Sequence, residues 1–156
     1  MLNMNRRASK GFIGMALILV CMLILLVCST VEASQVAPTV SGTATLTFNK
    51  SKKTLTVVIK MNGLVAGSIH ADHIHNGLCN PGTGTIHKGL TKIKGDKKTT
   101  TVLQNILSIP DNKWSINVHF GSNIAIPAQK VVIACGDILN PNNSNKVTVK
   151  LVPPPV

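Results

Sequence analysis

Short alternations of apolar and polar residues dominate the chain after residue 34. No window there shows the three-to-four-residue spacing of apolar side chains that is typical of an amphipathic helix. Runs rich in β-branched residues are instead separated by turn residues, which indicates an all-β domain. We predict strands near Val40–Phe48, Thr54–Met61, Ser68–His75, Leu90–Lys94, Thr99–Ile106, Trp114–Phe120, Val131–Ile138 and Lys146–Val152.

The segments between these runs have the composition of turns. Asn49–Lys52 and Lys94–Lys97 are expected to form hairpin loops. Asn140–Asn145 contains a proline and four asparagines, so it is expected to be a loop. A longer loop rich in glycine and proline is predicted over Asn76–Gly89. Together these elements predict one β-sandwich or barrel over residues 34–156, with no internal repeat.

The first 33 residues follow a different pattern. Arg6, Arg7 and Lys10 precede an uncharged apolar run that extends to about Cys28. This order is typical of an export signal. Because the run is near the lower limit for crossing a bilayer, two fates stay open. Residues 1–33 are either a signal peptide cleaved before Ser34 or an N-terminal membrane anchor, and either fate predicts a secreted or membrane-anchored, extracytoplasmic domain.

The expected exported part carries thirteen lysines, no arginine and four aspartates, which gives a net charge of +9 with neutral histidines. Such a field attracts anions, so anionic cell-envelope polymers or a membrane surface are candidate partners. Nucleic acid is not expected, because the chain has one tryptophan, no tyrosine and no basic run interleaved with aromatics. The sequence leaves the oligomeric state open.

Histidines supply the candidate chemistry. His73 and His75 are separated by one residue, so on a strand both rings would project from one face while Ile74 points into the core. His119 ends a run in which polar and apolar residues alternate, and it lies on the polar face. We predict that His73, His75 and His119 converge on one ion at about 2.0–2.1 Å from each nitrogen, and that binding weakens below about pH 6. His70 is expected at the surface, and Asp72 is expected to be an exposed charge beside His73.

Two cysteines follow the apolar leader, Cys79 and Cys135. An even pair in an exported domain predicts a disulfide.

The order of several short motifs resembles copper/zinc superoxide dismutase and the related CHRD module. The motifs are Met61-Asn62-Gly63-Leu64, His73-Ile74-His75, Asn117-Val118-His119 and Ala134-Cys135-Gly136-Asp137-Ile138. The resemblance implies a Greek-key β-sandwich of about eight strands. It also implies that His73, His75 and His119 are copper ligands, that Cys79 pairs with Cys135, and that His87 corresponds to the histidine bridging copper and zinc.

The chain departs from the dismutase pattern at other positions. The remaining zinc ligands have no counterpart, Asn123 stands where an aspartate links the two metal sites, and Val132 replaces the arginine that guides superoxide. Lys130 is the nearest candidate to take over that arginine's part. Copper is therefore favoured over zinc as cofactor, and the sequence leaves open whether the domain is an enzyme. Two functions stand: a copper-binding or superoxide-handling domain, or a non-catalytic cell-surface module whose histidines bind no metal.

Overall fold

A computed structural model of the chain describes residues 39–79, 84–95 and 97–154. The expected leader and its cleavage point before Ser34 lie outside these residues. The strands are β1 (Ser41–Asn49), β2 (Thr54–Asn62), β3 (Ile69–His70), β4 (Asp72–Asn76), β5 (Ile86–Gly89), β6 (Ile93–Lys94), β7 (Thr99–Leu103), β8 (Trp114–His119), β9 (Val132–Ile138) and β10 (Lys146–Leu151), and the short helix is α2 (Pro127–Lys130). Within the described residues, no helix has the length and apolar character needed to span a membrane.

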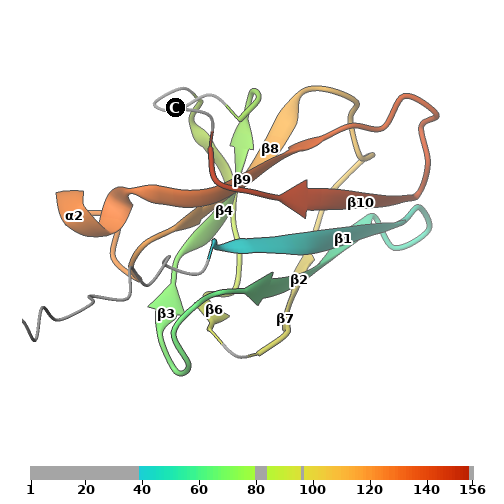
Figure 1. Cartoon of the computed structure of the whole chain (residues 1–156). Helices are drawn as coiled ribbons and strands as arrows, with labels where there is room; N and C mark the ends of the chain where they lie inside the picture. The colour runs from blue at the N-terminus through green and yellow to red at the C-terminus, as the bar shows by residue number, and fades with distance from the viewer. Residues whose placement is uncertain (1–38, 80–83, 96, 155–156) are drawn as a thin grey trace, which may run out of the picture. The chain divides into compact units, whose positions relative to one another are not determined.

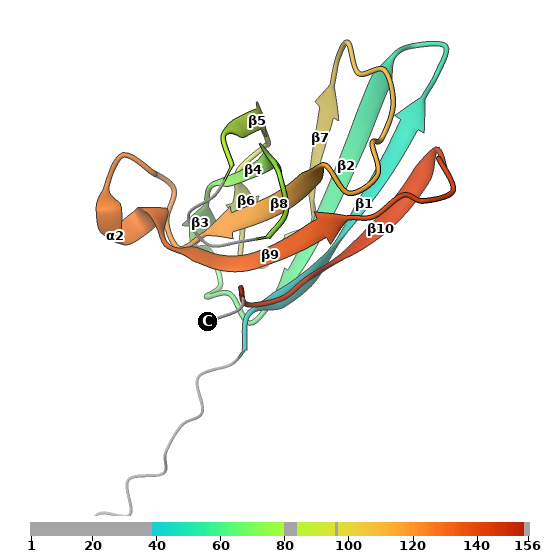
Figure 2. The same cartoon turned by 90° about the horizontal axis from the view of Figure 1, so that it is seen from above.

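Two four-stranded antiparallel sheets enclose the core (Figures 1 and 2). One sheet has the order β10-β1-β2-β7 and the other the order β5-β4-β8-β9, while β3 and β6 form a separate two-stranded pair. An isolated bridge between Cys135 and Val152 links β9 to the end of β10, so the sheets meet along one side. The predicted all-β sandwich is confirmed.

Alternation decides which side chains form the core. In β1 the side chains of Ala44, Leu46 and Phe48 are buried, and those between them are more exposed. Ile74 of β4 is fully buried, as predicted. Burying an aliphatic side chain of this size contributes about 1.5–3 kcal/mol. The same alternation sends every second residue of β4 and β8 to the opposite face of their sheet, where the histidines lie.

The turn chemistry holds the β1–β2 hairpin as the sequence predicted. Asn49 pairs with Thr54 across the two strands. The side-chain oxygen of Asn49 accepts hydrogen bonds from the Ser51 hydroxyl at 2.8 Å and from the Lys52 amide at 3.0 Å. Asparagine side chains are suited to this role because they satisfy turn donors locally.

Four features differ from the prediction. The strand expected over Ser68–His75 is interrupted at Ala71, which divides it into β3 and β4. β5 lies inside the segment predicted as a loop, because the edge of β4 offers it backbone partners that its own sequence does not reveal. The strand expected over Leu90–Lys94 shortens to β6. The four-residue helix α2 was also not predicted.

Candidate metal centre

Adjacent strands bring the three candidate histidines together. β4 pairs with β8 so that His73 faces Asn117 and His75 faces Ser115. These residues occupy the face of the sheet opposite Ile74 and Ile116, which are fully buried in the core. The register between β8 and β9 shifts at Val118 and His119, which marks a bulge. Because bulges re-aim a side chain locally, this irregularity acts at the residue that must reach the other two rings.

The three rings are close to one another. One ring nitrogen from each of His73, His75 and His119 lies within 4.8 Å of the other two. The ring centroids of His73 and His119 are 5.3 Å apart, those of His73 and His75 are 5.9 Å apart, and those of His75 and His119 are 6.2 Å apart. Two nitrogens bound to one ion at about 2.0–2.1 Å lie at most about 4 Å apart, so small ring rotations would suffice for shared coordination.

Each ring presents one buried nitrogen that has no hydrogen-bond partner among the described residues. These atoms are His73 Nδ1, His75 Nε2 and His119 Nε2. Buried polar atoms without partners are rare and call for an explanation, such as an ion bound by them. A shared ion would satisfy all three nitrogens at once.

Backbone carbonyls fix which nitrogen carries the proton in two of the rings. His119 Nδ1 lies 2.6 Å from the carbonyl oxygen of Lys130, and His75 Nδ1 lies 3.4 Å from that of Gly84. A carbonyl only accepts, so Nδ1–H is the donor in each case and Nε2 keeps its lone pair. This is the outer-shell arrangement that orients metal-binding histidines. The second nitrogen of each ring is therefore available as a ligand.

Burial favours the neutral form of the rings on β4. Desolvation lowers the pKa of His73 to about 4, and repulsion from His119 and His75 acts in the same direction. Desolvation also lowers the pKa of His75, opposed by its hydrogen bond to the Gly84 carbonyl. Neutral imidazole is the form that binds metal. At neutral pH these two rings would need to lose no proton before binding a metal ion.

His70 is not at the surface, contrary to the prediction. Its side chain is 5% exposed, and its Nδ1 lies 2.9 Å from the carbonyl oxygen of His119. Its Nε2 lies 2.7 Å from the Ser68 hydroxyl oxygen. His70 thus holds the main chain at His119 rather than joining the three rings. The partner is 49 residues away in sequence, so no local pattern could have revealed this role.

Asp72 is also buried, although an exposed charge was expected. It is 1% exposed, and neither carboxyl oxygen has a hydrogen-bond partner among the described residues. Strand alternation places it on the face of β4 opposite His73. Desolvation raises the pKa of Asp72 to about 7. It therefore does not orient the neighbouring imidazole; it is an acid held within the sandwich.

His87 lies away from the three rings. Its ring packs against that of Trp114, with centroids 4.6 Å apart and planes tilted by 31°. It is not one of the described histidines whose ring nitrogens gather within ligand range. The structure therefore separates His87 from the site to which the dismutase resemblance would assign it.

A disulfide joins Cys79 to Cys135, with Cα atoms 5.9 Å apart, and this prediction is confirmed. The Cys79 amide donates to the Asp137 carboxylate at 2.6 Å, which adds a second link between this loop and β9. Cys135 faces Asn117 in the neighbouring strand, and Asn117 faces His73. The bridge therefore fastens the loop that leaves β4 to the same sheet that carries the histidines.

The family model for the CHRD domain matches residues 27–124, which is more than half of the chain. This segment includes His73, His75 and His119 and ends before Cys135. Neither the curated proteins nor the solved structures contain a match, so the dismutase resemblance rests on the motifs alone. On the strength of the matched segment, the chain belongs to the CHRD domain family.

Proposed function

We propose that this CHRD domain binds one copper ion through His73, His75 and His119. The observation that carries the proposal is the set of three buried, unpartnered ring nitrogens, one from each histidine. Copper is proposed ahead of zinc because copper stands highest in the affinity series of divalent ions for nitrogen ligands. The dismutase resemblance points to the same metal.

Copper bound there would supply one-electron chemistry between its two common oxidation states. The chain's own contribution is to hold three neutral imidazoles with their lone pairs aimed at one point, and to fix two of them through the Lys130 and Gly84 carbonyls. The excess of lysines attracts anions such as superoxide. However, Val132, which pairs with His119 in the sheet, stands where the dismutase has the arginine that guides superoxide, and it carries no charge. We therefore propose that the domain holds copper and does not consume superoxide.

We further propose that the domain acts outside the cytoplasm. The basic head and the apolar run before residue 34 support export. The Cys79–Cys135 disulfide supports an oxidising compartment, because such bonds persist there and are rare in the cytosol. N-terminal sequencing of the exported protein would distinguish cleavage near Ala33 from a retained anchor, and recovery only from the cytosol would contradict export.

Copper titration of the full chain, recovered from the oxidising compartment and stripped of metal, tests the proposed site. Cu(II) competing with a chelator of known affinity should occupy one site per chain. His119→Ala should weaken this site by at least about 100-fold, since one of three ligands is lost. His87→Ala is the matched control, because it removes a histidine that lies against Trp114 and should leave the affinity unchanged.

The same titration distinguishes copper binding from the second candidate function, a non-catalytic surface module. If the wild type binds neither Cu(II) nor Zn(II) at micromolar concentration, the histidines serve only to tie loops to the sheet. The non-catalytic surface module would then replace the copper-binding function. Saturable binding that His119→Ala leaves unchanged would place the metal elsewhere and would equally reject the three-histidine site.

Acid should weaken Cu(II) binding, because protons compete for the imidazole nitrogens. Because the pKa of His73 is about 4, protons compete with the metal for this ring only near pH 4 and below. Affinity should therefore fall less steeply between pH 6 and pH 5 than three ordinary histidines would give. A loss of affinity corresponding to three protons over that interval would contradict the lowered pKa of His73, whereas the His119→Ala titration tests the ligand set.

A further inference from the structure

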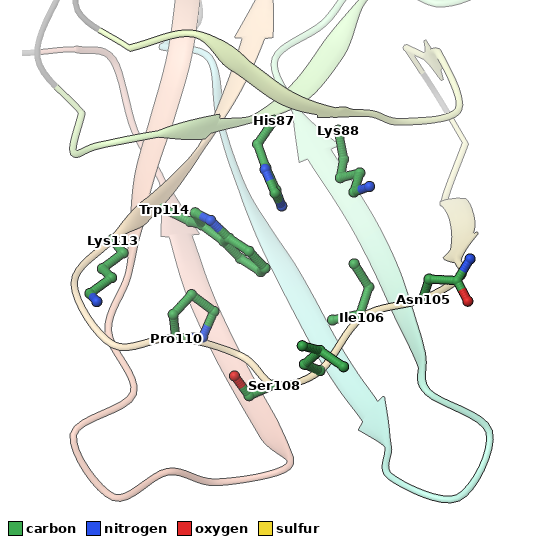
Figure 3. A pocket seen from close by; sticks show the side chains of 9 residues that line it. His87, Lys88, Asn105, Ile106, Ser108, Pro110, Lys113 and Trp114 are labelled. Atoms are coloured by element: carbon green, nitrogen blue, oxygen red, sulfur yellow. The ribbon is translucent and has the colours of Figure 1, made fainter.

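A second candidate site lies on the other face of the histidine-bearing sheet. A groove of about 360 Å³, open to solvent on one side, runs between β5, the start of β8 and the loop between β7 and β8. Ile106, Pro110 and Trp114 give it apolar walls, as Figure 3 shows. Trp114 alternates with Ser115, so its side chain points away from the face that carries the three histidines. The volume is within the range of small-ligand sites.

A fixed aromatic ring forms one wall of this groove. Trp114 is only partly buried and packs against the core cluster. The ring of His87 lies against the indole, with centroids 4.6 Å apart and planes tilted by 31°. His87 and the core limit the movement of the indole, and its exposed part presents a rigid apolar surface to the groove. Such surfaces accept the C–H faces of sugar rings as well as aromatic ligands.

Positive charge lies on two opposite sides of the aromatic ring. Lys113 and Lys88 both line the groove, and Figure 3 shows the rings of Trp114 and His87 between them. No acidic side chain is among the described residues that line it. The nearest acid in the sequence, Asp111, is engaged elsewhere, because its carboxylate accepts the Asn140 amide at 2.5 Å. The groove therefore favours an anion.

The positive surface continues beyond the groove. The Ile106 amide donates to the Lys53 carbonyl at 3.0 Å, which ties the groove-lining loop to the β1–β2 turn. That turn carries Lys50, Lys52 and Lys53, all exposed. The turn therefore adds three exposed lysines to the positive charge near the groove-lining loop.

We propose that this groove binds an acidic oligosaccharide, a uronate-containing segment of a cell-envelope polysaccharide. One sugar ring lies against Trp114, and carboxylates on neighbouring sugars meet Lys88 and Lys113. The Asn105 amide and the Ser108 hydroxyl, which also line the groove, hydrogen-bond to sugar hydroxyls. The arrangement suits a linear ligand with charge on both sides of an apolar ring face. The proposal is independent of copper, because the groove and the three histidines lie on opposite faces of the sheet.

Trp114 is the chain's single tryptophan and there is no tyrosine, so intrinsic fluorescence reports directly on the groove. The full chain in metal-free buffer is titrated with oligogalacturonate, and the fluorescence shift of Trp114 is followed. A neutral cello-oligosaccharide of equal length, polyglutamate and 2-naphthoate serve as comparison ligands. Oligogalacturonate should give a saturable shift that weakens with added salt, as charge screening requires. The neutral sugar and polyglutamate should bind at least about tenfold more weakly.

Variants test the two halves of the groove. Lys88→Gln with Lys113→Gln should raise the Kd for oligogalacturonate at least about tenfold, because two charge contacts are lost. Lys60→Gln with Lys146→Gln removes the same charge from exposed positions outside the groove and should change the Kd less than about twofold. Trp114→Leu leaves the net charge unchanged and should also weaken binding. Its binding is measured by calorimetry, because the substitution removes the fluorescent side chain.

Four results would overturn the proposal. Equal binding of polyglutamate would mean that charge alone attracts the ligand. Equal binding of the neutral sugar would remove the part played by the lysines. Binding of 2-naphthoate without oligogalacturonate would make the groove a site for a small aromatic anion. Equal losses in the Lys88/Lys113 and Lys60/Lys146 pairs would place the sugar outside the groove.

Discussion

Replacing Asp72 by asparagine should change how the stability of the metal-free domain depends on pH. Asp72 is 1% exposed, and burial raises its pKa from 3.8 to about 7. The folded state therefore keeps a proton that the unfolded chain has released between these two pH values. In that window the Asp72 contribution lowers the free energy of unfolding as pH rises, by about 1.4 kcal/mol per pH unit. The whole effect is about 4 kcal/mol and is complete above pH 7.

His73 acts in the opposite direction over nearly the same window. Burial and the nearby histidines lower its pKa from 6.5 to about 4. The unfolded chain then holds a proton that the folded state lacks, so this contribution falls as pH decreases from 6.5 towards 4. Its size is about 3 kcal/mol. Between pH 4 and 6.5 the folded pair holds one proton on Asp72, and the unfolded pair holds one proton on His73. The two slopes should largely cancel in the wild type.

Single substitutions should reveal how much Asp72 and His73 each contribute to the change of the free energy of unfolding with pH. Relative to wild type, Asp72→Asn should gain about 4 kcal/mol of stability between pH 4 and pH 7, apart from a constant offset for its amide. His73→Gln should become less stable relative to wild type as pH rises from 4 to 6.5, by about 3 kcal/mol. Asp111→Asn is the control, because it removes an exposed carboxylate, keeps an oxygen that can accept the Asn140 amide, and leaves Asp72 and His73 in place.

Urea unfolding at a series of pH values, followed by Trp114 fluorescence with chelator present and the disulfide intact, measures these differences. A stability curve for Asp72→Asn that runs parallel to wild type from pH 4 to pH 7 would show that the buried carboxyl is not held protonated. The reasoning from its burial would then fail.

Three further predictions concern stability and use the same unfolding assay. Replacing Cys79 and Cys135 together by serine opens a link across 56 residues and should lower the free energy of unfolding by about 4 kcal/mol; an unchanged value would show that the bridge does not form in solution. Ile74→Ala, at a fully buried position, should cost about 2–5 kcal/mol, whereas Val102→Ala, 54% exposed, should cost under about 0.5 kcal/mol. Gly136→Ala should destabilise by at least about 2 kcal/mol, because a Cβ there would meet the carbonyl oxygen of Lys150, and wild-type stability would refute that close approach.

Local alternation was enough to predict much of the fold. Polar and apolar positions alternate through β1, β2 and β8, and this period alone predicts which residues form the core. It also predicts that His73 and His75 share a face opposite Ile74. The elements that it missed are short and depend on pairing: β5 has four residues, and its strand conformation comes from the edge of β4.

The sequence predicted that the three histidines converge, but not the register and the bulge that set their distances. The distance between His73 and His119 depends on the register of β4 against β8 and on the bulge at Val118 and His119. The burial of His70 depends on a carbonyl 49 residues away. Asp72 was misjudged because an aspartate is usually exposed. Here strand alternation places Asp72 on the same face of β4 as Ile74, so its side chain lies inside the sandwich.

The Nδ1–H groups of His75 and His119 donate to main-chain carbonyls, not to side chains. Any amino acid supplies a carbonyl, so Lys130 can be exchanged without removing the bond to His119. What matters is the path of the segment that follows β8, which returns to the sheet where the Phe120 amide donates to Val131 at 2.7 Å and the Gly121 amide to Gln129 at 3.0 Å. The geometry of the histidines should therefore tolerate sequence divergence in this segment but not insertions or deletions. In distant relatives, conserved loop length would be a better sign of a shared site than conserved loop residues.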